Sequence, residues 1–237
     1  GIEYTYESLL RGRIGSQAVE TDASGREINV LDSTPATPGL NAVLSIDTEL
    51  QRAVENILRQ SMGASLNAAA CIIDVNTGDI LAMVSLPDYD SNLFSGEVNE
   101  AALEKIAKDP GKPMLNHVIS EMYPPGSTFK QITGLASLQE GVATAGTQIT
   151  SFGYISVKNE FNPNIVYTFR DWRSDLGTMN FYRGLAMSSD VYFYYLAGGY
   201  AENGRQIFKG LGATKLAEWA RRFGLGEPTG VDLPGES

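Results

Sequence analysis

Apolar residues recur at helical spacing in the first third of the chain. In one stretch, this spacing is carried by Leu50, Val54, Ile57 and Leu58. The pattern predicts an amphipathic helix, with Asp47 or Thr48 available as its N-cap and an end near Gly63. Three further helices are predicted, over residues 127–139, 179–198 and 204–223.

Strand patterns occur in two regions. Residues 68–74 and 80–84 are short apolar runs on either side of an Asn-Thr-Gly-Asp turn. This arrangement predicts a β-hairpin that is buried on at least one face. Residues 150–178 alternate aromatic and β-branched residues with polar ones, which predicts an irregular β segment.

Two stretches of the chain lack a clear periodic pattern. Residues 1–40 are rich in Gly, Ser, Thr and charged residues and contain only short apolar runs. Within them, residues 32–39 include two prolines and are expected to form a linker or an extended strap. Residues 86–126 are interrupted by prolines and predict loops with a short helix.

Composition and charge narrow the possible classes of function. The 237 residues are 43% hydrophobic and 19% charged, which is typical of a globular chain with a sizeable core. The net charge of −10 disfavours nucleic acid as a partner. A single Cys and a single His exclude an intrachain disulfide and a Cys/His metal cluster. The chain opens on Gly1 rather than Met, so we expect it to be a piece of a longer protein.

The segment around Ser127 carries the strongest candidate chemistry. A Pro-Pro-Gly run at residues 124–126 cannot continue a helix, so a helix is expected to begin at Ser127. Ser127 and Lys130 then lie on one face of its first turn, where unpaired N–H groups favour a developing anion. A partly desolvated Lys amine loses its proton readily and can accept that of a serine. A lone Ser-x-x-Lys match is common by chance, so its weight rests on this context.

A second candidate lies in the run Ser188-Ser189-Asp190. A hydroxyl and a carboxylate two residues apart can approach a reacting serine from a neighbouring loop or helix start. The same residues are also typical of the N-cap of the helix that follows. Taken alone, this capping role is the better supported of the two.

Together, these motifs resemble the transpeptidase domain of class B penicillin-binding proteins, the serine acyltransferases that cross-link peptidoglycan. The segments that carry the likeness are, in order, residues 1–12, 22–26, 44–51, 77–87, 123–130 and 229–236. The resemblance implies an α+β fold, with an antiparallel sheet flanked by helices, a helical subdomain and an incomplete C-terminal part. Residues 1–40 are then expected to be the end of a pedestal domain and a linker. Residues 41–237 are expected to be the N-terminal part of the transpeptidase domain.

The resemblance assigns roles to four residues. Ser127 is expected to be the acylated nucleophile and Lys130 the base that activates it. Ser188 is expected to relay a proton to the leaving amine. Asp190 is expected to bind substrate at a position that the family usually fills with Asn, although a carboxylate cannot donate the hydrogen bonds of an amide.

The third motif of the family, Lys-Thr-Gly, is absent from the sequence, and residues 228–230 read Pro-Thr-Gly. In the family, that motif lies on a strand of the active site. It supplies a carboxylate-binding hydroxyl and helps to form the oxyanion hole. Without it, this chain alone is expected to be inactive and to leave its hairpin with an open apolar edge.

The implied activity is that of a peptidoglycan D,D-transpeptidase, with stem peptides and β-lactam antibiotics as its ligands and with no cofactor or metal. The implied partners are a membrane glycan polymerase and other cell-wall assembly proteins. The implied location is the extracytoplasmic face of the bacterial cytoplasmic membrane, reached through an N-terminal anchor outside this chain. Two alternatives stay open: a serine β-lactamase, and a β-lactam sensor or assembly scaffold without transfer activity.

Overall fold

The computed structural model describes residues 1–94, 99–159, 161–162, 164–202 and 204–237. The chain divides into two compact units. Unit 1 comprises Gly1–Met122 with Gly230–Ser237, and unit 2 comprises Tyr123–Thr229. Each unit contains helices and antiparallel strand pairs, in agreement with the α+β prediction. The domain boundary predicted after residue 40 falls inside unit 1 and stays a prediction.

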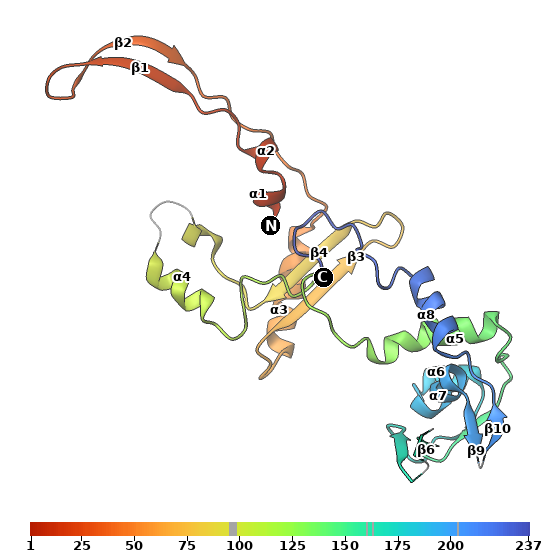
Figure 1. The fold of residues 1–237 in the computed structure, drawn as a ribbon. Helices are drawn as coiled ribbons and strands as arrows, with labels where there is room; N and C mark the ends of the chain where they lie inside the picture. The colour runs from red at the N-terminus through yellow and green to blue at the C-terminus, as the bar shows by residue number, and fades with distance from the viewer. Residues whose placement is uncertain (95–98, 160, 163, 203) are drawn as a thin grey trace. The chain divides into compact units, whose positions relative to one another are not determined.

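A β-ribbon follows two short helices at the start of unit 1 (Figure 1). The elements are α1 (Ile2–Thr5), α2 (Glu7–Leu10), β1 (Ser16–Thr21) and β2 (Glu27–Thr34). Residues 32–34, which we expected in a linker, instead pair with β1. Every residue of β2 is exposed. Its sequence alternates only briefly, with Ile28 and Val30 between polar residues, and the pattern ends at Leu31, so it is too short to predict the strand.

The predicted amphipathic helix and β-hairpin of unit 1 are confirmed. They are α3 (Thr48–Ser61), β3 (Ala68–Ile73) and β4 (Ile80–Leu86). Asp47 caps α3 by accepting hydrogen bonds from two N–H groups of the first turn. Gln51 ties the helix to the hairpin, because its side-chain amide exchanges two hydrogen bonds of 2.8 Å with the backbone of Met83.

The two faces of this hairpin differ in exposure. Ala82 and Val84 are buried, whereas Cys71 pairs with Met83 on the opposite face and is exposed. Among the described residues, β3 pairs with β4 alone. The hairpin therefore presents two edges of the kind that native proteins pair or cover. The rest of unit 1 has a short turn, η1 (Ser91–Phe94), and the helix α4 (Glu100–Ala107), as predicted for this stretch.

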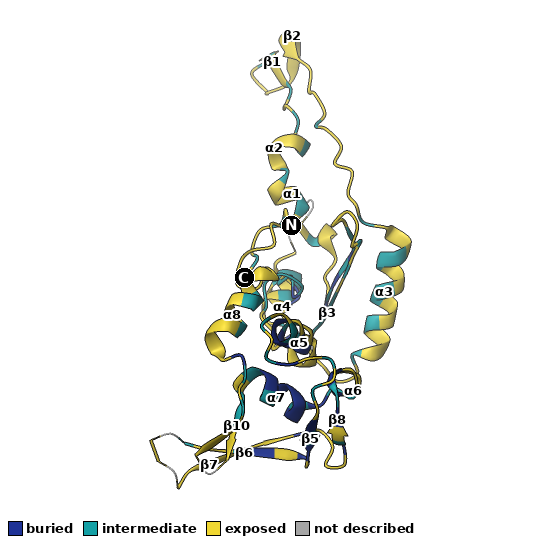
Figure 2. Cartoon of the chain, turned by 90° about the vertical axis from the view of Figure 1, so that its right-hand side faces the viewer, coloured by how far each residue is buried: buried dark blue, intermediate teal, exposed yellow. Residues whose placement is uncertain are grey.

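Unit 2 is built around two helices, α5 and α7, on which buried residues concentrate (Figure 2). Its helices are η2 (Gly126–Phe129), α5 (Lys130–Gln139), α6 (Phe181–Ala186), α7 (Asp190–Gly198) and α8 (Ala213–Arg222). Its strands are β5 (Ile149–Ser151), β6 (Tyr154–Lys158), β7 (Val166–Arg170), β8 (Gly177–Met179), β9 (Tyr200–Glu202) and β10 (Arg205–Phe208). The core gathers Tyr192 and Leu196 of α7, both with 0% exposure, against strand residues such as Ile149 and Met179.

The irregular β segment predicted over residues 150–178 is confirmed by β5 to β8, with residues 160 and 163 lying outside the described part. Two helix predictions in unit 2 are wrong in extent. The helix predicted over 179–198 is divided into α6 and α7, because the chain turns at Ser188 and Ser189 caps a new helix. The helix predicted over 204–223 begins only at Ala213. Residues 205–208 instead pair with β9, and Gly212, at φ +81°, separates that ribbon from α8.

In the described part of the chain, no helix is both long enough and apolar enough to cross a membrane.

Candidate active site

Ser127 lies on the short turn that leads into α5. Gly126 has a φ of +56°, a conformation that glycine adopts without strain. The next residues form the 3-10 turn η2, so the α-helix begins at Lys130 and not at Ser127 as predicted. The Thr128 hydroxyl donates a 2.6 Å hydrogen bond to the carbonyl of Pro125 and fixes this turn. After the Pro-Pro-Gly run, a 3-10 turn therefore takes the place of the first α-helical turn that we predicted. Ser127 is exposed on this 3-10 turn.

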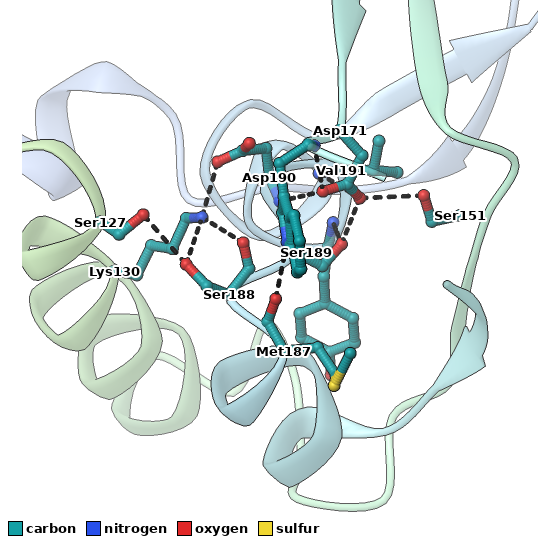
Figure 3. Close-up of polar contacts among 11 residues, drawn as sticks. Ser127, Lys130, Ser151, Asp171, Met187, Ser188, Ser189, Asp190 and Val191 are labelled. Carbon is teal, nitrogen blue, oxygen red and sulfur yellow. Dashed lines mark hydrogen bonds and ion pairs between the residues drawn. The ribbon is translucent and has the colours of Figure 1, made fainter. Parts of the chain in front are cut away.

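Lys130 is the polar centre of the site (Figure 3). Its side chain is 11% exposed, and its Nζ donates to the Ser188 carbonyl at 2.6 Å and to Ser188 Oγ at 3.1 Å. The same Nζ forms an ion pair with Asp190 Oδ1 at 2.6 Å. It also lies 5.8 Å from the ring centre of Phe193, a cation–π distance. A buried ammonium is thus satisfied by three oxygens from one loop.

Ser188 connects this lysine to Ser127. Its Oγ accepts the bond from Lys130 and donates a 3.0 Å hydrogen bond to Ser127 Oγ. The three side chains form the chain Lys130 Nζ, Ser188 Oγ, Ser127 Oγ (Figure 3). The structure therefore brings together the four residues singled out in the sequence, with Asp190 paired to the lysine at its end.

The backbone at Ser188 is held in an uncommon conformation. Its φ is +50°, in the left-handed region that few residues other than Gly, Asn and Asp adopt. The next residue, Ser189, is fully buried and caps α7 by accepting a hydrogen bond from the N–H of Tyr192. The capping role considered for this run thus falls to Ser189, which leaves Ser188 and Asp190 directed at Lys130.

Two sequence families match the chain. The "Penicillin binding protein transpeptidase domain" matches residues 68–237, and the "Penicillin-binding Protein dimerisation domain" matches residues 1–44. This chain belongs to the penicillin-binding protein transpeptidase family.

Similar proteins with names of their own support the family assignment. The peptidoglycan D,D-transpeptidase MrdA of Acinetobacter baumannii is 34% identical over the whole chain, which spans 32% of that protein. Among solved structures, the complex between penicillin-binding protein PBP2 and MreC from Helicobacter pylori matches with a TM-score of 0.76 and 30% identity. It covers 100% of this chain and 40% of that one.

A third similar structure is the ceftriaxone acyl-enzyme complex of penicillin-binding protein A from M. tuberculosis. It has a TM-score of 0.68 and 30% identity, covering 81% of this chain and 41% of that one. The resemblance to class B penicillin-binding proteins and the fold class expected from it are therefore confirmed.

The structure adds two residues to the candidate site that sequence reasoning missed. Asp171, 9% exposed, accepts hydrogen bonds from the Ser151 and Ser189 hydroxyls at 2.9 and 2.6 Å. Trp172 Nε1 donates a 2.8 Å hydrogen bond to the carbonyl of Met187. The available signal was an Asp-Trp pair directly after an alternating strand pattern, but its partners lie 15 to 20 residues away.

The electrostatics of the site are dominated by carboxylates around one cation. Burial raises the pKa of Tyr194, and the nearby Asp190 and Asp171 raise it further, so its hydroxyl stays neutral. Among the described residues, no cluster of three or more His, Cys, Asp or Glu side chains could hold a metal ion. The structure instead gathers two serine hydroxyls and a lysine amine, groups that can carry out nucleophilic chemistry.

Proposed function

We propose that this chain forms the nucleophile-bearing part of a peptidoglycan D,D-transpeptidase that acts on stem peptides and is acylated by β-lactams. The observation that carries the proposal is the hydrogen-bonded chain from Lys130 through Ser188 to Ser127. It supplies a nucleophile, a relay and a base without histidine. Relatives named as D,D-transpeptidases support the substrate class.

In the proposed reaction, Ser127 Oγ attacks the carbonyl carbon of the scissile peptide bond. For this step, Lys130 first releases a proton to solvent, and the two hydroxyl hydrogens turn so that Ser127 donates to Ser188 and Ser188 donates to the Lys130 amine. The Ser127 proton then passes to Ser188 Oγ as the Ser188 proton passes to Lys130 Nζ. The C–N bond then breaks, and the leaving amine takes a proton from Ser188, which Lys130 replenishes. The acyl group on Ser127 is transferred to an acceptor amine, or it remains as a long-lived adduct when a β-lactam supplies it.

Asp190 has two parts in this proposal. Its carboxylate pairs with Lys130 at 2.6 Å and holds the amine against Ser188. Its side chain is 32% exposed, so its free edge can also accept a hydrogen bond from substrate. We therefore propose Asp190 as a substrate-binding residue that also orients the base.

The proposed enzyme needs parts that this chain does not supply. The sequence contains no Lys-Thr-Gly motif, and the chain spans 32% and 34% of its first curated relatives. Loss of one oxyanion donor typically costs about 10²–10³ in rate. We therefore propose that residues 41–237 form the first part of a longer transpeptidase domain, and that residues 1–40 end a pedestal domain. Family matches to residues 68–237 and 1–44 support that division.

The proposed location is the extracytoplasmic face of the bacterial cytoplasmic membrane, with the anchor outside this chain, because peptidoglycan peptides lie there. We propose a glycan polymerase and other cell-wall assembly proteins as partners. The solved complex of the related Helicobacter pylori protein with MreC supports an assembly of this kind.

The experiment uses the full-length protein that contains this chain. Fluorescent penicillin should label it covalently, and peptide mass mapping should place the adduct on Ser127. Ser127→Ala should abolish labelling, whereas the matched variant Ser174→Ala, an exposed serine of the same unit, should label normally. Undiminished labelling of Ser127→Ala would refute the assignment.

Product analysis then separates the readings that the sequence left open. With a stem-peptide donor and an amine acceptor, a transpeptidase yields the cross-linked product. A β-lactamase yields rapidly hydrolysed penicillin instead, and a sensor yields only a stable adduct. Absence of the cross-linked product, in the presence of labelling at Ser127, would overturn the transpeptidase reading while leaving the nucleophile intact.

A further inference from the structure

Two consecutive residues outside the predicted site hold the turn that carries Ser188. We infer that Asp171 and Trp172 are positioning residues, which keep Ser188 Oγ in hydrogen-bonding reach of both Ser127 and Lys130. We call the pair the Asp171–Trp172 clamp. The inference rests on the proposed function, and its test below separates the two.

Asp171 holds the C-terminal side of the turn. Its Oδ1 accepts from the N–H groups of Asp190 and Trp172, at 2.9 and 3.1 Å. Its Oδ2 accepts from three further donors, which are Ser151 Oγ at 2.9 Å, Ser189 Oγ at 2.6 Å and the Val191 N–H at 3.3 Å (Figure 3). A buried carboxylate thus meets donors alone, at the N-terminus of α7, where the helix dipole also favours a negative charge.

Trp172 holds the N-terminal side. Its Nε1 donates a 2.8 Å hydrogen bond to the carbonyl of Met187, the residue directly before Ser188. The indole is 59% exposed, so its side chain contributes little to the core of unit 2. The hydrogen bond to Met187 is therefore the clearest contribution of this side chain to the fold.

The clamp explains how Ser188 keeps an unfavourable backbone. A non-glycine residue at φ +50° persists only when its surroundings determine its conformation. Residues on both sides of Ser188 are held by the clamp, and Lys130 binds the Ser188 carbonyl itself at 2.6 Å. If the clamp is weakened, the turn relaxes, and Ser188 Oγ leaves its position between the nucleophile and the base.

Two variants test the inference in the full-length protein. Trp172→Phe keeps an aromatic ring and removes only the indole donor, so we expect the first-order rate constant of penicillin acylation to fall about tenfold. Asp171→Asn places an amide N–H₂ group against the hydroxyl and N–H donors that now bind Asp171. We therefore expect the same rate constant to fall about a hundredfold. In both variants, the constant for non-covalent penicillin binding should change less than twofold, because the clamp acts on the proton relay.

Matched controls come from the same unit. Trp219→Phe also removes an indole hydrogen bond, here a 3.0 Å bond to Glu140, the residue that follows α5. Asp175→Asn removes an exposed carboxylate that pairs with Arg173. Both controls should acylate within twofold of the unaltered protein. If the Asp171→Asn protein does not fold, Trp172→Phe alone tests the inference. This variant is expected to fold, since Trp172 is largely exposed.

A double variant distinguishes positioning from general destabilisation. In a Ser188→Ala background, Trp172→Phe should cost less than a further twofold in rate, because the group it positions is already gone. A persisting tenfold loss in that background would mean that Trp172 acts elsewhere, and it would overturn the inference.

The test also separates this inference from the proposed function. If the unaltered protein is not acylated at Ser127, the proposed function fails, whatever the clamp does. A crystal structure of Trp172→Phe then still judges the clamp, which requires Ser188 to leave its positive φ and its contact with Ser127. Acylation within twofold by both clamp variants, or an unchanged turn in that structure, would refute the clamp.

Discussion

Ser188 Oγ donates a 3.0 Å hydrogen bond to Ser127 Oγ across 61 residues of sequence. The same oxygen accepts a 3.1 Å hydrogen bond from Lys130. Lys130 and Ser127 are therefore connected through a second serine. In the proposed function, this relay, rather than the Ser-x-x-Lys spacing alone, is the functional unit of the site.

The first prediction concerns Lys130. Lys130→Ala in the full-length protein should reduce penicillin labelling at least about a hundredfold, because it removes the proposed base and the cation that binds Asp190. The Ser127→Ala/Lys130→Ala double variant should lose little more than Ser127→Ala, since the two groups act as a unit. Labelling rates and circular dichroism of each variant check this. Lys158→Ala, at an exposed lysine, is the control, and a Lys130→Ala protein that labels normally would contradict the prediction.

The second prediction tests the expectation that Asp190 takes the position that the family usually fills with Asn. Asp190→Asn keeps an oxygen that accepts from Lys130 Nζ, so we expect acylation to stay within about tenfold of the unaltered rate. Asp190→Ala removes that acceptor and should lose about ten times more. The second-order rate constant with penicillin is the measurement. Equal rates for the two variants would show that the oxygen that accepts from Lys130 at position 190 has no part in acylation.

A pH-dependent contribution to stability is expected at Glu140. Hydrogen bonds from Lys215, and then from Trp219, hold the pKa of Glu140 below its ordinary value of 4.5. A carboxyl with a lowered folded-state pKa stabilises the fold above its unfolded-state pKa, and this stability is lost as the pH falls through the folded-state pKa. We therefore expect the Glu140→Gln variant to have a lower Tm than the unaltered protein near neutral pH. Between about pH 6 and about pH 3, the Tm of the variant should fall by less than that of the unaltered protein. Calorimetry measures both values. Glu218→Gln is the control, because Glu218 lies on α8, the helix that carries Lys215 and Trp219.

The last prediction concerns residues 1–237 alone. We expect this polypeptide to show no penicillin acylation, because its sequence contains no Lys-Thr-Gly motif, which in the proposed function supplies carboxylate binding and helps to form the oxyanion hole. We also expect a further strand to pair with the β3–β4 hairpin in the full-length protein, since among the described residues β3 has no other partner than β4. Hydrogen exchange of the β3 and β4 amides, in the polypeptide and in the full-length protein, measures this pairing. Equal protection in the two, or acylation by the polypeptide at the rate of the full-length protein, would contradict the prediction.

The extent to which the sequence predicted this structure depends on the range of each interaction. The helix Thr48–Ser61 and the hairpin that follows it were predicted because apolar periodicity and turn residues act between near neighbours. The β2 strand was not predicted, because it is exposed along its whole length and its apolar alternation is limited to Ile28 and Val30. The division of the helix predicted over 179–198 was also missed, because an apolar run continues across Ser188 while contacts from elsewhere hold the turn there.

The sequence by itself determined the residue types of the candidate active site and the placement of Ser127 and Lys130 within one turn of each other. Only the tertiary structure decided that Ser188 and Asp190, 58 and 60 residues from Lys130, bind its amine, and that Ser189 caps the helix instead. It also decided that Asp171 supports them. A hydrogen bond depends on atoms within about 3 Å in space, and the folding of α5, α7 and the strand before Asp171 brings these distant residues to that distance.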